Sequence, residues 1–326
     1  MMKITMSHGS GGALTGSLIH DIFIKHFHNP ILDRMEDGAV LKVSGRVVLT
    51  TDSFVVTPMF FPGGDIGKLA VCGTVNDLAM MGAIPKYLTA GFIIEEGTEL
   101  EELDRIAGSM AAAAKEARVK IVAGDTKVIE GRGGVYINTS GIGEVAVSRV
   151  SVSNCRKGDA ILVSGNMGEH HAAIMSRRMG IENRIQSDCA PLTGILREFL
   201  KEGLQVHFMR DITRGGLATI LNEITAGSRC GVAVREEAIP VSSQIRGFCD
   251  ILGLDPLYMA NEGKMLAVVP GKKAEQALAA MKRSRYGRDA AIIGEITEGS
   301  SVSMTTRLGG NRRIELLYGE GLPRIC

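Results

Sequence analysis

The segment that most constrains the fold is IGKLAVCGTVNDLAMMG, residues 66–82, because it reads as a helix with almost no polar side. Asp65 precedes the segment as a helix cap, and Gly82 ends it. A helix without a solvated face has to be buried. Asp77 lies inside this segment, and a carboxylate there is costly to bury unless it binds a cation or accepts hydrogen bonds. Asp77 is therefore a candidate ligand.

The length of the chain favours two domains, because 326 residues are many for one compact core. Strand and helix patterns mix in both halves, which predicts an α+β (mixed α/β) fold. A polar link over residues 151–157 leads into a new strand, a glycine turn and a helix. We expect the boundary near residue 150, with domains at 1–150 and 151–317 and a mobile tail at 318–326.

Local patterns in the first half predict its elements. Helices are expected at residues 14–27, 66–82 and 99–119, and strands at residues 84–96, 120–126 and 134–145. Residues 39–56, AVLKVSGRVVLTTDSFVV, read as two strands joined in a hairpin at Ser44-Gly45.

Composition excludes several classes of function. The 37 basic and 36 acidic side chains leave a net charge of +1, so a nucleic-acid partner is not expected. The six cysteines form no C-x-x-C pair, which argues against a zinc site. No apolar run approaches the roughly 20 residues that cross a bilayer, and we expect no membrane association and a cytoplasmic protein with reduced thiols.

A glycine-rich segment, HGSGG at residues 8–12, precedes the first helix. Its backbone N–H groups can converge on an anion, although a flexible turn explains the residues equally well. Aspartates also recur, most of them at element ends: Asp37, Asp52, Asp77, Asp125 and Asp211. Scattered carboxylates suit magnesium bound to nucleotide phosphates, although each is also typical of a cap or turn.

Two short motifs add a possible base and a possible fixed cation. Glu262 lies in NEGK and Lys127 in DTK, and each motif alone is more typical of a surface turn. His170 and His171 lie at an expected helix start, where solvent exposure of at least one is favoured.

Together these motifs carry a family resemblance over nearly the whole chain. The segments that carry it are HGSGG, EDGAV, TTDSF, FFPGGDIGKLAVCGTVNDLAMMGAIP, GDTKV, RDITRGGL, ANEGK and the final PRIC. The chain resembles the HypE family of hydrogenase maturation proteins, in the superfamily of aminoimidazole ribonucleotide synthetase and selenophosphate synthetase.

The resemblance implies a two-domain synthetase-like fold, with an N-terminal α/β domain whose sheet pairs across a homodimer and a larger C-terminal α+β domain. ATP and Mg²⁺ are implied between the domains. The positions that match metal ligands are Asp37, Asp77 and Asp211, with Asp52 close by. The positions that match the nucleotide site are Gly9, Gly11, Gly12, Lys68, Asp125 and Thr126.

The implied function is ATP-dependent dehydration of a carbamoyl group carried on Cys326. The carbamoyltransferase HypF supplies the group, and the cyano product passes to iron held by the HypC–HypD proteins. Residues 318–326, fully extended, reach roughly 30 Å, which suits a carrier thiol. We assign Lys127 to the developing phosphoryl charge and Glu262 to proton removal, with His170 as the alternative base.

Two other functions remain open. A phosphotransferase of the purine or selenophosphate type would act on a diffusible substrate, although no cysteine lies near the glycine loop as the selenophosphate branch requires. A non-catalytic nucleotide-binding scaffold would need no base.

Overall fold

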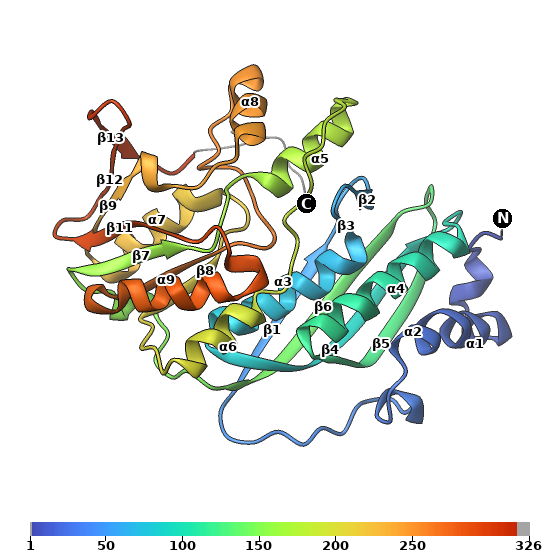
Figure 1. Ribbon diagram of the computed structural model, residues 1–326. Helices are drawn as coiled ribbons and strands as arrows, with labels where there is room; N and C mark the ends of the chain where they lie inside the picture. Colours follow the sequence, from blue (N-terminus) through green and yellow to red (C-terminus); the bar gives the residue numbers. More distant parts are fainter. Residues whose placement is uncertain (1, 318–326) are drawn as a thin grey trace.

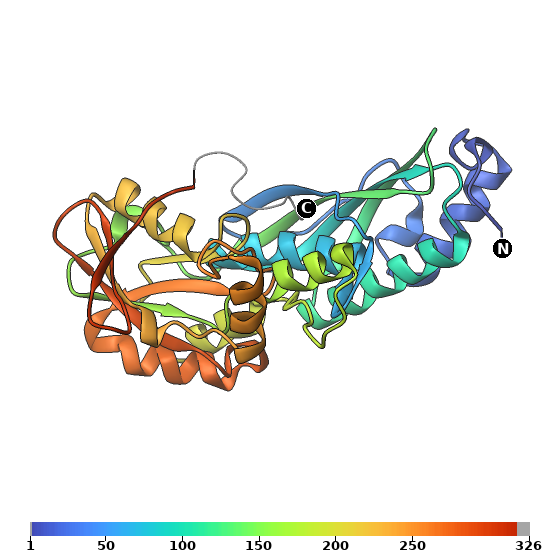
Figure 2. The same cartoon turned by 90° about the horizontal axis from the view of Figure 1, so that it is seen from above.

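The computed structural model describes residues 2–317, which form two sheets with flanking helices (Figure 1). The two sheets lie end to end, so the molecule is elongated (Figure 2). The first sheet has the strand order β1-β6-β4-β5. Its strands are β1 (Val47–Phe54), β4 (Ala83–Glu95), β5 (Lys120–Ile129) and β6 (Val135–Val145). Within this sheet, β4 and β5 run parallel and the other neighbouring strands run antiparallel.

Helices α3 (Ile66–Met80) and α4 (Leu100–Ala117) cover one face of the first sheet (Figure 1). Helix α3 is buried on almost every side, as its apolar sequence predicts. The Asp65 carboxylate accepts a hydrogen bond from Lys68 N at 2.9 Å, and Gly82 follows the helix with φ +73°. The predicted cap and stop are confirmed.

The other face of this sheet carries exposed apolar side chains in the single chain. Leu49 on β1 is 70% exposed, and Ile93 on β4 is 45% exposed. An uncovered sheet face with large apolar residues is typical of a surface that another chain covers.

The amino-terminal helix runs without a break through three consecutive pieces. These pieces are α1 (Ala13–Leu18), the π-helical η2 (Ile19–Ile24) and α2 (Lys25–Phe27), so the helix predicted for residues 14–27 is confirmed. It packs at the β5 edge of the sheet, where the rings of Phe23 and Phe92 lie 4.5 Å apart.

The predicted hairpin over residues 39–56 is wrong. Only its second half is a strand, β1, which pairs antiparallel with β6 from Val47↔Glu144 to Phe54↔Ile137. Residues 39–46 form no strand, and Val40 in this stretch is 78% exposed. The first half has no partner that would bury one of its faces, and without such a partner β-branched residues do not form a strand.

The second sheet has the order β13-β12-β9-β11-β7-β10-β8. Its strands are β7 (Asp159–Val163), β8 (Phe208–Asp211), β9 (Gly231–Arg235), β10 (Met265–Pro270), β11 (Ala291–Thr297), β12 (Val302–Thr305) and β13 (Asn311–Ile314). Alternate residues face two cores: Ile161 packs with α7 (Gly216–Ser228), whereas Leu162 packs with α6 (Thr193–Lys201) and α9 (Ala274–Arg283). The predicted mixed α/β fold is confirmed.

The remaining elements are short or connect the sheets. They are η1 (Met6–Gly9), η3 (Leu32–Arg34), β2 (Phe60–Phe61), β3 (Gly64–Asp65), η4 (Val152–Asn154), α5 (Glu169–Met179), η5 (Glu236–Ala238), α8 (Ser243–Leu252), η6 (Gly271–Lys273) and η7 (Arg285–Gly287).

One hydrophobic core joins the two halves of the chain. It combines side chains of α3 and α4 with Ala172 and Ile174 of α5, with Cys189, and with Phe248 of α8. In residues 2–317, no helix has both the length and the hydropathy needed to cross a bilayer.

Candidate active site

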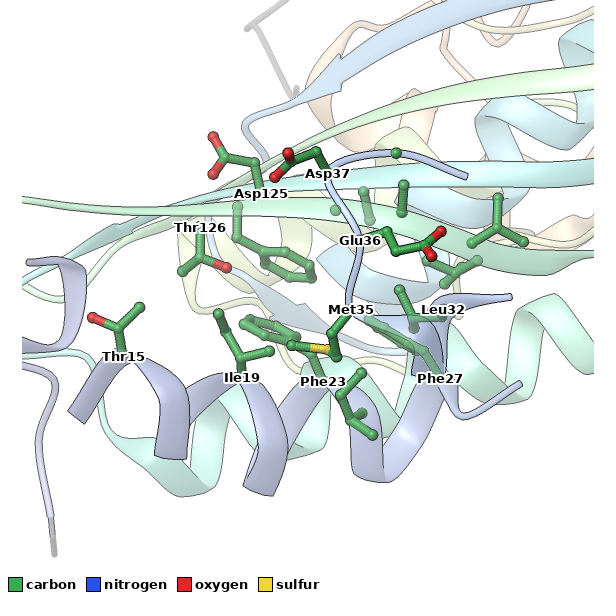
Figure 3. A pocket seen from close by; sticks show the side chains of 18 of the residues that line it. Thr15, Ile19, Phe23, Phe27, Leu32, Met35, Glu36, Asp37, Asp125 and Thr126 are labelled. Atoms are coloured by element: carbon green, nitrogen blue, oxygen red, sulfur yellow. The ribbon is translucent and has the colours of Figure 1, made fainter. Parts of the chain in front are cut away.

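Two separate cavities collect most of the candidate residues. The first, here called the β5 cavity, has a volume of about 340 Å³ and lies between the amino-terminal helix and strand β5 (Figure 3). Its floor is apolar and includes Phe23, Phe27 and Phe92. Its polar rim is formed by Gly9, Gly11, Asp37, Asp125, Thr126 and Lys127.

The rim of the β5 cavity combines backbone donors with opposite charges. Lys127 Nζ lies 2.7 Å from the Asp125 carboxylate, and this bond lowers the pKa of Asp125 below its usual range. Asp37 and Asp125 lie together at the upper rim, above the rings of the floor (Figure 3). Gly11 adopts φ +84° and donates its N–H to Thr15 Oγ1 at 2.9 Å. The rim can therefore meet a charged group, while the floor suits a flat apolar one.

The second cavity, here called the β1 cavity, has a volume of about 100 Å³ and contains carboxyl groups from four parts of the fold. Asp52 comes from β1, Asp77 from α3 and Asp211 from the end of β8, and Glu262 joins them from the loop before β10. Thr50 Oγ1 donates to the Asp77 carboxylate at 2.9 Å. The apolar helix α3 thus turns its one carboxylate toward the junction of the two sheets.

Burial and mutual repulsion raise the pKa values of this group. Burial raises the pKa of Asp52 and of Asp77, and the charge of Asp52 adds to the effect on Asp77. Burial, and then the charge of Asp77, raises the pKa of Asp211 to about 7. The pKa of Glu262 lies well above its usual range because of burial, followed by the nearby Cys189 and Asp211. Such a group stabilises bound protons or a bound cation.

The carboxylate oxygens of the β1 cavity suit a hard cation, but they supply only part of its coordination shell. Carboxylate oxygens are the ligands of Mg²⁺, which commonly takes one or two of them and keeps several waters. However, no three His, Cys, Asp or Glu side chains within residues 2–317 are arranged to hold a metal ion by themselves. A cation in the β1 cavity would need oxygens from a ligand or from water to complete its shell.

The structure therefore divides the predicted site residues between two places. Asp37 lies in the β5 cavity, apart from Asp77 and Asp211, with which the family resemblance groups it. Gly12 and Lys68 line neither cavity, and Lys68 Nζ donates to Gly63 O at 3.0 Å. Cys326 lies outside the described residues.

The two cavities lie at opposite edges of the first sheet. Asp125, Gly91, Asn138 and Ser53 form one row across β5, β4, β6 and β1, so Asp125 and the β1 edge are three strand spacings apart, about 14 Å. The side chains of Asp52 and Asp125 also point to opposite faces of the sheet, because Asp52 faces α3 whereas Asp125 alternates with Thr126, which lies on the α3 face and points into the β5 cavity (Figure 3).

Several residues expected at the surface are buried. Both His170 and His171 are buried, at 0% and 3% exposure, so the expected solvent exposure of one of them is wrong. The reason is that α5 packs between the two halves, where His170 meets the ring of Phe61 edge-on at 5.3 Å. Burial lowers the pKa of His170 to about 4, and its Nδ1 lies 2.7 Å from Ser187 Oγ. The surface-turn alternative for NEGK is also wrong, because Glu262 is only 7% exposed.

Two polar residues beside the β1 cavity were missed by sequence reasoning. Asn76 precedes Asp77 on α3, is 1% exposed, and bonds both Ala190 O and Leu192 N. A second polar residue inside an apolar helix was a usable signal. Asp188 holds the backbone of Glu262 and Gly263, and nothing in QSDCA distinguishes it from an ordinary loop residue.

Comparison with known families gives two adjacent matches. The N-terminal domain of the AIR synthase related proteins matches residues 35–145, and their C-terminal domain matches residues 156–307. The chain is 49% identical to carbamoyl dehydratase HypE of Azotobacter vinelandii over 332 aligned residues, which cover 99% of this chain and 97% of that protein.

Solved structures give the same relation. A crystal structure of the hydrogenase maturation protein HypE in complex with ATP superposes with a TM-score of 0.95 at 46% identity, and the match covers 98% of this chain and 99% of that one. A chain from a HypE–HypF complex superposes with a TM-score of 0.81 at 48% identity, covering 93% and 100% respectively.

Proposed function

The chain belongs to the HypE family of carbamoyl dehydratases, within the AIR synthase related proteins, and we propose that it converts a carbamoyl group on Cys326 into a thiocyanate with ATP. This is its role in hydrogenase maturation, where the cyano group becomes a ligand of the iron. The observation that carries the proposal is the buried Glu262 in a cavity of acidic groups, because proton removal from an amide needs a strong, water-shielded base.

The β5 cavity is the proposed site of the adenine end of ATP. Its apolar floor can stack a flat base against Phe23 and Phe92, and its rim offers Gly9, Gly11 and Lys127 to phosphates. The ATP complex of a relative at 46% identity supports nucleotide binding by this chain. Lys68, Asp125 and Thr126 remain proposed nucleotide contacts. Gly12 is proposed as a contact as well, because it follows Gly11 in the glycine-rich segment directly before α1.

The β1 cavity is the proposed metal site. Asp77 and Asp211, with Asp52 beside them, would hold Mg²⁺, and Asp37 would join them only with a change in the position of its loop. When bound, the ion supplies positive charge that stabilises the transferring phosphoryl group. The raised pKa of Asp211 supports this assignment, since a bound cation would offset both the burial of its carboxylate and the repulsion by Asp77.

The proposed reaction has two stages, phosphoryl transfer and then elimination of phosphate. The carbonyl oxygen of the S-carbamoyl group attacks the γ-phosphorus, the bond to the ADP oxygen breaks, and ADP leaves. One nitrogen proton is lost as the C=N bond forms, and loss of the second proton expels inorganic phosphate to give S–C≡N. Lys127 stabilises the charge on the phosphoryl oxygens, and Glu262 accepts a nitrogen proton. A raised pKa makes the ionised Glu262 a stronger base.

We further propose that each site is completed across a homodimer. Lys127 and Glu262 belong to different cavities at opposite edges of one sheet, so one bound ATP does not reach both in a single chain. The exposed Leu49 and Ile93 on the uncovered face supply a surface for a second copy. In that arrangement, the β5 edge of one protomer meets the β1 edge of its partner.

The proposed partners follow from the same family. HypF as carbamoyl donor is supported by the HypE–HypF complex of a relative at 48% identity. The HypC–HypD proteins are the proposed acceptors of the cyano group. A cytoplasmic location is part of the proposal, and the cysteines found unpaired among residues 2–317 are compatible with a reducing compartment.

Mass spectrometry of the intact chain tests the function. After incubation with HypF, a carbamoyl donor and ATP, wild type should gain about 43 Da on the peptide of Cys326 and then lose about 18 Da as water. Cys326→Ala should gain nothing, whereas Lys127→Ala and Glu262→Gln should accept the carbamoyl group and stall before the loss of water. Mass gain by Cys326→Ala would contradict the carrier role.

A further inference from the structure

A short segment, residues 187–192, bridges the helix that carries Asp77 and the loop that carries Glu262. On the α3 side, Asn76 Nδ2 donates to Ala190 O at 3.0 Å, and Leu192 N donates to Asn76 Oδ1 at 2.7 Å. On the other side, Ala190 N donates to Glu262 O at 3.3 Å. The segment therefore touches the element next to each of the two proposed functional carboxyl groups.

Asp188 makes the central contact of this bridge. Its side chain is fully buried, with 0% exposure. Its carboxylate accepts the Gly263 N–H at 2.9 Å and the Glu262 N–H at 3.2 and 3.3 Å to its two oxygens. Two backbone donors on one carboxylate fix the orientation of the two peptide units that flank the Glu262 side chain.

The backbone of this loop packs directly against the backbone of Asp188. A Cβ atom on Gly263 would lie 1.9 Å from the carbonyl oxygen of Asp188, so only glycine fits at that position. Asn261 in the same loop is tied as well, because its N–H donates to Ile212 O at 3.0 Å, next to Asp211. The Glu262 backbone is thus held from both sides.

A buried cation balances the charge of Asp188. Lys264 Nζ lies 3.9 Å from the Asp188 carboxylate and 3.1 Å from that of Glu169. Asp188 itself does not line the β1 cavity, so it is not placed to touch a substrate there. Its contacts are with the backbone that presents Glu262 and not with the reacting atoms.

We propose that Asp188 is a positioning residue for the dehydration step: its carboxylate clamps the Glu262–Gly263 backbone so that the Glu262 carboxyl faces the β1 cavity. This inference rests on the proposed function. Asn76 ties the same clamp to α3, which keeps the base from the second half of the chain in register with Asp77 from the first half. Loss of the clamp therefore slows proton removal while nucleotide binding and carbamoyl loading continue.

The test compares Asp188→Asn with Asp289→Asn in the full-length chain. Asparagine has nearly the same shape as aspartate but can accept only with its single oxygen. Asp289 is the matched control, because it is exposed and bonds Asn166 Nδ2 at 3.2 Å instead of the loop of residues 261–263. We measure carbamoyl loading, the conversion rate to thiocyanate as a function of ATP concentration, and the melting temperature.

Asp188→Asn should lower kcat for conversion roughly 10- to 100-fold, the scale of a small misplacement of a catalytic group, with loading, KM for ATP and melting temperature near wild type. Asp289→Asn should behave as wild type. If Asp188→Asn is recovered only as aggregate, Asn76→Ser, which removes the bonds that tie this segment to α3 at Ala190 and Leu192, carries the same test and should lower kcat in the same way.

Two results would overturn the inference. One is a normal conversion rate in Asp188→Asn. The other is a rise in KM and a fall in melting temperature that match the loss of rate, since that pattern indicates a merely structural role. These results leave the proposed function intact, because wild type still forms the thiocyanate. A wild-type chain that never gains the carbamoyl mass would instead reject the proposed function and this inference with it.

Discussion

Replacement of Asp211 by asparagine should stabilise the chain at high pH and have little effect at low pH. Burial and the charge of Asp77 raise the pKa of Asp211 from an ordinary 3.8 to about 7. The folded chain therefore binds this proton more tightly than the unfolded chain. The stability that the bound proton contributes is fully present below the unfolded pKa and is lost as the pH rises through about 7.

The size of the effect follows from the difference in pKa. About three pKa units at about 1.4 kcal/mol each give roughly 4 kcal/mol as an upper value. Entry of water and relaxation around an ionised group reduce such costs, so we expect about 1–3 kcal/mol. Because asparagine does not titrate, the free energy of unfolding of Asp211→Asn relative to wild type should grow between pH 4 and 7 and then stay constant.

Thermal unfolding without nucleotide, in the presence of EDTA, measures this difference at pH 4.5 and pH 8. The melting temperature of Asp211→Asn should exceed that of wild type by several degrees at pH 8 and by much less at pH 4.5. Asp125→Asn is the control, because Asp125 is exposed and Lys127 lowers its pKa, so no gain at pH 8 is expected. An equal pH dependence in wild type and Asp211→Asn would refute the description of the β1 cavity.

Two further predictions concern the nucleotide. Asp77→Asn should weaken binding of Mg²⁺-ATP about tenfold without loss of the fold, and unchanged binding in calorimetry would contradict the metal assignment. A mixture of Lys127→Ala and Glu262→Gln chains, each inactive alone, should recover about a quarter of the wild-type conversion rate, because half of randomly formed dimers then contain one intact site. No recovery after verified exchange of protomers would show that each site belongs to one chain.

Local sequence patterns were sufficient for most elements of the first half. The apolar character of residues 66–82 predicted a buried helix, Asp65 its cap and Gly82 its end, and all three are observed. These features depend on side chains within a few residues of each other, and such contacts are written directly in the sequence. Asp77 was likewise conspicuous because a carboxylate in an apolar helix needs a partner.

Features that depend on distant parts of the chain were not readable in this way. The hairpin over residues 39–56 failed because β1 pairs with β6, about ninety positions further along the chain. His170 and Glu262 looked like surface residues, and both became buried when α5 and the loop before β10 packed against other elements.

By itself, then, the sequence determined the periodic elements, their caps and the family, because local propensity and motif residues carry this information. Tertiary structure alone decided how the acidic residues group. Asp77, Asp211 and Glu262 meet in one cavity from three distant elements, whereas Asp37 and Asp125 gather at the opposite edge of the sheet. Strand order sets this division, because it puts β1 and β5 at opposite edges of the first sheet, and strand order arises from long-range pairing that no local pattern encodes.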